Sequence, residues 1–166
     1  MGVEFKDMKK AIAIIVLGLL WCNVSAAQSM VPLKKYVIDN SQYVEDPITL
    51  TYVLKRCGAA YLYAATITKD KDKKISEQFT KAYGKVTMFA GQVLMEGMNW
   101  SEEVASKSLF TDIENMLNYY EKDGNDSFAR TGNYMMDNYI AEDIIICNGV
   151  LESMKWKNIL KDTVTT

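Results

Sequence analysis

The sequence contains no histidine, and this absence excludes several large classes of protein chemistry. Without histidine there is no Ser-His-Asp or Cys-His nucleophile system, and no Glu-x-x-His motif of a di-iron helical bundle. Zinc sites of the usual histidine-containing kinds and covalent haem attachment through Cys-x-x-Cys-His are excluded as well. We therefore predict a protein without enzymatic activity, without a cofactor and without a bound metal.

Proline and glycine are scarce, with two prolines and nine glycines among 166 residues, so the chain has few breaks. No segment alternates apolar and polar residues convincingly enough to predict a strand, and the apolar spacing is helical almost throughout. The sequence therefore predicts an all-α protein, with one domain and a single core.

A long apolar run is also missing. The run Ala11–Cys22 has twelve mostly apolar residues, fewer than the roughly 20 that cross a membrane as a helix. Two lysines precede it and the small residues Ser25–Ala27 follow it, an order typical of a secretory signal peptide. We expect residues 1–27 to be that signal peptide, cleaved after Ala26 or after Ala27. An uncleaved N-terminal anchor is the disfavoured alternative, because the run is too short.

The chain has no excess of positive charge. Its net charge is −2, and residues 1–27 hold three lysines and two acidic residues, so the mature chain has a net charge of −3. Nucleic-acid binding and polybasic attachment to a membrane surface both need a basic face. We expect a periplasmic or secreted protein that has no nucleic-acid partner and no membrane span after cleavage.

The remaining 139 residues predict an up-down-up-down bundle of four helices after an N-terminal arm. Residues 28–45, with Pro32 and mixed polar residues, read as an extended arm, and residues 46–166 as the bundle domain. Asp46-Pro47 is a good helix start, a capping carboxylate followed by proline at the first helical position. We predict helices over Pro47–Thr68, from Ile75 to about Gly97, from Ser101 to about Asp123, and from Ser127 or Asn133 to about Leu160.

Two cysteines remain in the mature chain, Cys57 and Cys147, each on the inward seam of its own predicted helix. The first and last helices of an up-down bundle are neighbours, so the two thiols can meet. In an oxidising compartment the simplest interpretation is a structural disulfide. A redox-active pair would be expected to have Cys-x-x-Cys spacing, which this pair lacks. We predict a Cys57–Cys147 bridge.

Asp143 occupies a seam position of the last predicted helix, between Ile140 and Cys147. A carboxylate facing the core is costly unless it is paired, so Asp143 is a candidate binding residue. The favoured alternative is that this helix rotates slightly and leaves Asp143 at the boundary of the core, near Arg56 or Lys55 of the first helix.

Two further groups of side chains suggest binding. Tyr52 and Tyr63 lie three helical turns apart, away from the main seam of their helix, and exposed tyrosines anchor protein interfaces. Ordinary half-buried residues are the favoured interpretation for most tyrosines of the chain, but a second aromatic stripe on this helix favours a face that binds a partner. Met95 and Met98 place two thioethers on one helical face, where soft sulfur could hold Cu(I), although adaptable core packing is the favoured interpretation.

With no catalytic group evident, the leading hypothesis is an exported protein that binds another envelope or secreted protein, in the manner of an inhibitor or an immunity protein. This hypothesis rests on architecture alone. The alternative is a carrier of a small molecule or a metal in the interior of the bundle. An enzyme that uses Asp143 and tyrosines is the third and least favoured hypothesis.

Overall fold

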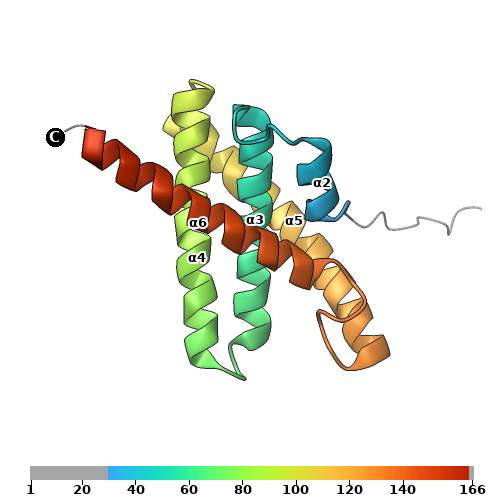
Figure 1. Cartoon of the computed structure of the whole chain (residues 1–166). Coiled ribbons are helices and arrows are strands. Elements are labelled where there is room, and N and C mark those ends of the chain that lie inside the picture. The colour runs from blue at the N-terminus through green and yellow to red at the C-terminus, as the bar shows by residue number, and fades with distance from the viewer. Residues whose placement is uncertain (1–29, 165–166) are drawn as a thin grey trace, which may run out of the picture.

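A computed structural model describes residues 30–164 of the chain, with side chains as far as Met154. The predicted signal peptide lies outside these residues. All the regular elements in the described part are helices, as predicted (Figure 1). They are α2 (Leu33–Asp39), α3 (Pro47–Thr68), α4 (Lys73–Gln92), the π-helix η1 (Val93–Gly97), α5 (Glu102–Thr131) and α6 (Ile140–Val164).

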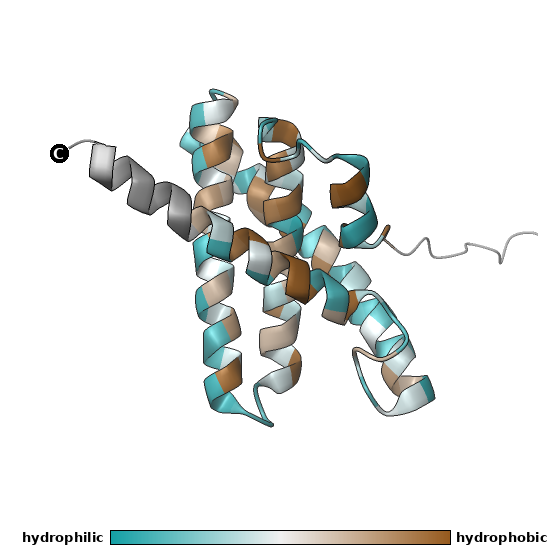
Figure 2. Cartoon of the chain, viewed as in Figure 1, coloured by the Kyte–Doolittle hydropathy of each residue, from teal (hydrophilic) through white to brown (hydrophobic). Residues whose placement is uncertain are grey.

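Helix α3 is the centre of the molecule. Thirteen of its 22 residues are buried, and it packs against α2, α4, α5 and α6. A methyl group added to Gly58 would lie 3.1 Å from Ile113 Cδ1, so the missing side chain lets α5 approach closely. Figure 2 shows the contrast, with apolar residues in the upper half of α3 and polar residues in the turn that leads into α4.

Helices α3 and α4 form an antiparallel hairpin whose ends follow local signals. Asp46 accepts hydrogen bonds from the amides of Ile48 and Thr49, and Pro47 occupies the first turn. The helix begins and ends at the predicted residues. Asp72 caps α4 by accepting a hydrogen bond from the amide of Ile75.

Helix α5 continues beyond its predicted end. The Asp123-Gly124-Asn125 sequence resembles a turn, but Gly124 is buried within the helix. A Cβ atom at Gly124 would lie 1.8 Å from the Tyr63 hydroxyl oxygen, so the glycine makes room for this ring. The helix ends instead at Gly132, which has φ of +74° and forms a left-handed cap.

The predicted start of the last helix, at Ser127 or Asn133, is wrong. Ser127 is buried in α5, and its hydroxyl donates to the carbonyls of Asn133 and Met136, which holds the 132–139 loop against α5. Helix α6 begins at Ile140. Figure 1 shows it crossing α3 and α4 obliquely, and the regular up-down arrangement of four helices is not confirmed.

The prediction of an extended arm over residues 28–45 is wrong for Leu33–Asp39, which form α2. No side chain in the described part of the chain caps this helix, but its first residue forms a hydrogen bond to a distant helix. The Leu33 amide donates to Asp143 Oδ1 at 2.8 Å, and the Leu33 side chain is fully buried. Of the described helices, none is long and apolar enough to span a membrane.

Candidate binding site at the junction of α3, α4 and α6

Asp143 is fully buried, so the prediction that it lies at the boundary of the core is wrong. The predicted contact of Asp143 with Arg56 is confirmed. The Asp143 Oδ2 atom accepts from Arg56 Nη2 at 2.6 Å and from Arg56 Nε at 3.0 Å. The Tyr120 hydroxyl donates to the same oxygen at 2.6 Å. Burial raises the pKa of the Asp143 carboxyl, while the positive charge of Arg56 opposes that rise.

The remaining nitrogen atom of the Arg56 guanidinium, Nη1, also has hydrogen-bond partners. Nη1 donates to the carbonyl of Val31 and to the Tyr52 hydroxyl, the latter at 3.3 Å, and the group lies 5.3 Å from the centre of the Tyr139 ring. This cluster therefore joins α2, α3, α5 and α6. Both charged side chains are fully buried, and neither lines a cavity found in the described part of the chain. The arrangement of this cluster is therefore that of a structural part of the core.

The Cys57–Cys147 disulfide is formed, as predicted, and links α3 to α6 beside this cluster. Both cysteines are fully buried, with Cα atoms 5.3 Å apart. The disulfide and the Arg56–Asp143 ion pair thus both hold α3 and α6 together where these helices cross.

Tyr52 and Tyr63 do not form the exposed stripe that was predicted for a partner. Tyr52 is half-buried, with its ring 4.2 Å from that of Tyr36. Tyr63 is 2% exposed and stacks on Tyr120, so its predicted role at a surface is wrong. Within the described part of the chain the buried Tyr63 hydroxyl has no hydrogen-bond partner, and burial raises the pKa of Tyr63 to about 12.

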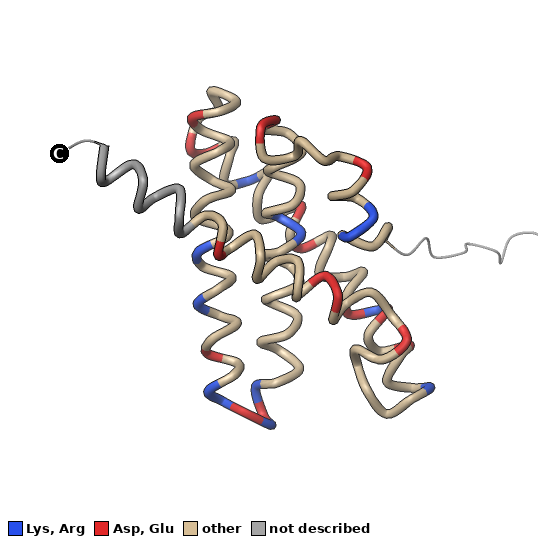
Figure 3. The backbone as a smooth tube through the Cα atoms, in the orientation of Figure 1, with Lys and Arg blue, Asp and Glu red and all other residues tan. Residues whose placement is uncertain are grey.

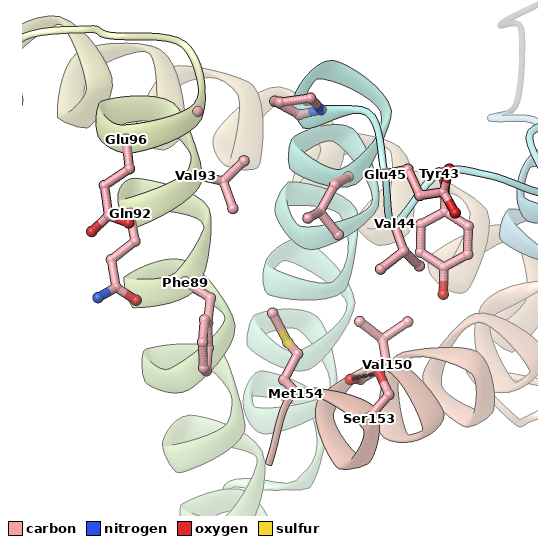
Figure 4. Close-up of a pocket in the computed structure, with 13 residues that line it drawn as sticks. Tyr43, Val44, Glu45, Phe89, Gln92, Val93, Glu96, Val150, Ser153 and Met154 are labelled. Atoms are coloured by element: carbon pink, nitrogen blue, oxygen red, sulfur yellow. Dashed lines mark hydrogen bonds between the residues drawn. The ribbon is translucent and has the colours of Figure 1, made fainter. Parts of the chain in front are cut away.

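A cavity of about 580 Å³ lies elsewhere, and no residue predicted as a binding residue lines it. It is bounded by the segment before α3, the start of α3, the end of α4 with η1, and α6. Figure 4 shows its side chains arranged around a shared space. The apolar ones are Val44, Pro47, Leu50, Phe89, Val93, Val150 and Met154.

One wall of this cavity is the π-helix η1, which contributes Val93, Glu96 and Gly97. A π-helix is a rare widening of an α-helix and occurs frequently at functional sites. The wall is held close to α3, because a Cβ atom at Gly97 would lie 3.2 Å from Pro47. The α-helical spacing that was expected to pair Met95 with Met98 is interrupted by this π-turn.

Two carboxylates line the cavity, those of Glu45 and Glu96, and they lie at opposite ends of it (Figure 4). Both are exposed, and no Lys or Arg is among the described residues that line the cavity. Figure 3 shows acidic residues where α3 begins and η1 ends, and at the other end of α4 both lysines and acidic residues.

A smaller hollow of about 250 Å³ adjoins the same segment of the chain. Its lining is polar and includes the carboxylates of Asp39 and Asp46. Tyr43 lines both the hollow and the cavity, and burial raises the pKa of its hydroxyl. An apolar space and an acidic surface therefore meet at Tyr43.

Within the described residues, no group of three acidic or cysteine side chains could hold a metal ion. The chain matches no known protein family, no curated protein and no solved structure. The cavity was not foreseen from the sequence, because its walls come from four separate segments. The glycine-containing end of the second predicted helix, near Gly97, was the one local sign of it.

Proposed function

We propose that this protein is an exported, non-catalytic binding protein that holds a small apolar ligand in the cavity between α3, α4 and α6. The observation that carries the proposal is the cavity itself. Its volume of about 580 Å³ falls within the roughly 300–1,000 Å³ of small-molecule sites, and its lining is mainly aliphatic and aromatic.

The surrounding scaffold supports this proposal. Val150 and Met154 line the cavity from α6, and Leu50 lines it from α3. The disulfide and the buried ion pair hold these two helices together. A site on rigid elements loses less conformational entropy on binding, so a preformed cavity of this kind favours affinity.

Export to the periplasm or the outside of the cell belongs to the same proposal. It is supported by the predicted N-terminal signal sequence and by the disulfide, a bond that persists in oxidising compartments. Intact-mass measurement of the protein from its host tests it, with cleavage expected after Ala26 or Ala27. Recovery of the uncleaved chain in the cytoplasm would contradict export.

Binding of a partner protein, as an inhibitor or immunity-type module, is the second candidate. Ile38 and Ile48 are each 65% exposed and flank the segment that leads into α3. Exposed apolar residues are common on monomeric proteins, however, so they weigh less than a formed cavity.

A cavity-filling substitution tests the proposed site. Val93→Phe places a larger side chain in the cavity, whereas Val104→Phe makes the same change at a valine of α5 that is 52% exposed and does not line it. With an environment-sensitive apolar dye as probe, we expect saturable binding by the unchanged protein and by the Val104 variant. The Val93 variant should bind at least about tenfold more weakly, a loss of about 1.4 kcal/mol.

Equal binding by the two variants would place the dye elsewhere and would refute the cavity as the binding site. Circular dichroism and thermal unfolding of each variant serve as the folding control, since only a folded Val93 variant is informative.

A further inference from the structure

We infer that the ligand is a cationic amphiphile, with its apolar part in the cavity and its cationic group at residues 39–46, beside Glu45. The inference rests on the proposed function and specifies the ligand class of the same site. The cavity accounts for the apolar part of such a ligand, and the charges around Tyr43 decide the sign of the head group.

Glu45 is the principal group in this argument. It is exposed, it lines the cavity, and no ion pair engages its carboxylate within the described part of the chain. A ligand cation at this position would meet an unneutralised negative charge with little competition from the protein.

The neighbouring carboxylates have the same sign. Asp46 accepts hydrogen bonds from the amides of Thr49 and Ile48, which hold its pKa below the ordinary value, so that it is negatively charged at neutral pH. Asp39 lines the adjoining hollow, and its charge is balanced by Lys35 at 2.7 Å. The segment therefore has a net negative charge beside the mouth of an apolar space.

This charge pattern disfavours the most common alternative, a fatty-acid anion. Binding proteins for carboxylates provide Arg or Lys at the head group, because a planar or point cation compensates the lost hydration. Here the described lining residues provide carboxylates instead. A fatty-acid head group would meet like charge, which disfavours binding.

A matched set of ligands tests the inference. Decylammonium, decanol and decanoate share one apolar chain and differ in head-group charge. Titration calorimetry on the purified protein with its disulfide intact should give affinities that fall in the order cation, alcohol, anion. Raising the salt concentration should weaken binding of the cation and leave that of the alcohol unchanged.

Substitution of Glu45 identifies the group responsible. Glu45→Gln should lower the affinity for decylammonium by about two- to fivefold at low salt, the range of an exposed ion pair, and leave decanol binding unchanged. Glu77→Gln is the matched control, because it removes the same charge from an exposed residue near the opposite end of α4. It should have no effect on either affinity.

The outcomes separate the two levels of the proposal. Tighter binding of decanoate than of decylammonium, or equal effects of the Glu45 and Glu77 substitutions, would overturn the cationic ligand class while the cavity remains a binding site. Failure of all three ligands to bind, together with an unchanged dye titration in the Val93→Phe variant, would overturn the proposed function itself.

Discussion

At the scale of single residues, the most consequential feature is a buried ion pair in the core. Arg56 and Asp143 are both fully buried, and each is surrounded by hydrogen-bond partners. A buried ion pair is weak evidence of net stabilisation, because removing two charges from water is costly. Removing one member alone has a much larger effect, because the remaining charge stays buried without a counter-ion.

We therefore expect Asp143→Asn to destabilise the protein by about 3–5 kcal/mol, measured by urea unfolding with the disulfide intact. Glu142→Gln is a close control, since Glu142 pairs with Lys34 at 2.8 Å on the surface, and there the cost should be under about 1 kcal/mol. Similar effects of the two substitutions would show that the buried pair is not the critical interaction.

A second residue-scale prediction concerns the contact between Gly124 and Tyr63. Gly124→Ala should destabilise the protein by about 1–3 kcal/mol, because the added methyl group overlaps the Tyr63 hydroxyl. Tyr63→Phe removes that oxygen, which has no hydrogen-bond partner among the described residues, and in the double variant it should partly restore the stability that Gly124→Ala removes. Thermal unfolding of the four proteins measures the coupling free energy.

Gly84→Ala is the control for that cycle. It makes the same change in a helix where the new methyl group meets nothing within 4 Å, and it should stabilise the protein by about 0.5–1 kcal/mol. Additive effects of the Gly124 and Tyr63 substitutions would contradict the proposed overlap.

At the scale of elements, local signals predicted the bounds of α3 and the capped start of α5, but they failed for the end of α5, for α2 and for the start of α6. Its start depends on Asp46 and Pro47, which act within one helical turn and can be read from sequence. The continuation of α5 through Gly124 depends on a ring from α3, and α2 depends on a hydrogen bond to Asp143. Such contacts link residues far apart in sequence, so propensity and spacing could not reveal them.

The candidate site shows the same limit. The pairing of Cys57 with Cys147 was predictable, because two cysteines on inward seams leave one intramolecular choice. The cavity was not, since it is an unfilled space between Val44, Phe89 and Met154 and leaves no pattern in any one segment. The burial of Tyr63 was missed because α5 covers a flank of α3 that a regular bundle would expose.

The α3–α6 crosslink gives the element-scale prediction. The double variant Cys57→Ser/Cys147→Ser should lose roughly 4–5 kcal/mol of stability, because the bridge closes a loop with a sequence separation of 90 residues. Urea unfolding of the variant and of the oxidised protein measures the difference. A loss below about 1 kcal/mol would indicate that the unfolded chain is already compact without the bridge.

At the scale of the whole molecule, buried tyrosines make stability depend on alkaline pH. Burial raises the pKa of Tyr61, Tyr63 and Tyr120 in the folded protein, while in the unfolded chain they titrate near 10. A pKa that is raised on folding contributes stability below the unfolded value, and this contribution is lost as pH rises toward the folded value.

We therefore expect the free energy of unfolding to be constant between about pH 7 and pH 9 and to fall above about pH 10, by up to about 1.4 kcal/mol per pH unit for each buried tyrosine. Urea unfolding across this range measures it, with tyrosinate absorbance as a second probe. Tyr61→Phe should reduce the slope. A flat profile to about pH 11.5 would contradict the raised pKa values.

The position of Arg56 has a consequence for how the protein is made. Its counter-ion lies 87 residues later in the chain, and the cysteine next to it finds its partner 90 residues later. A growing chain that has not yet reached α6 would hold the guanidinium of Arg56 in the middle of its central helix without the carboxylate of Asp143. We therefore expect the core around Arg56 to be completed only after α6 has been synthesised.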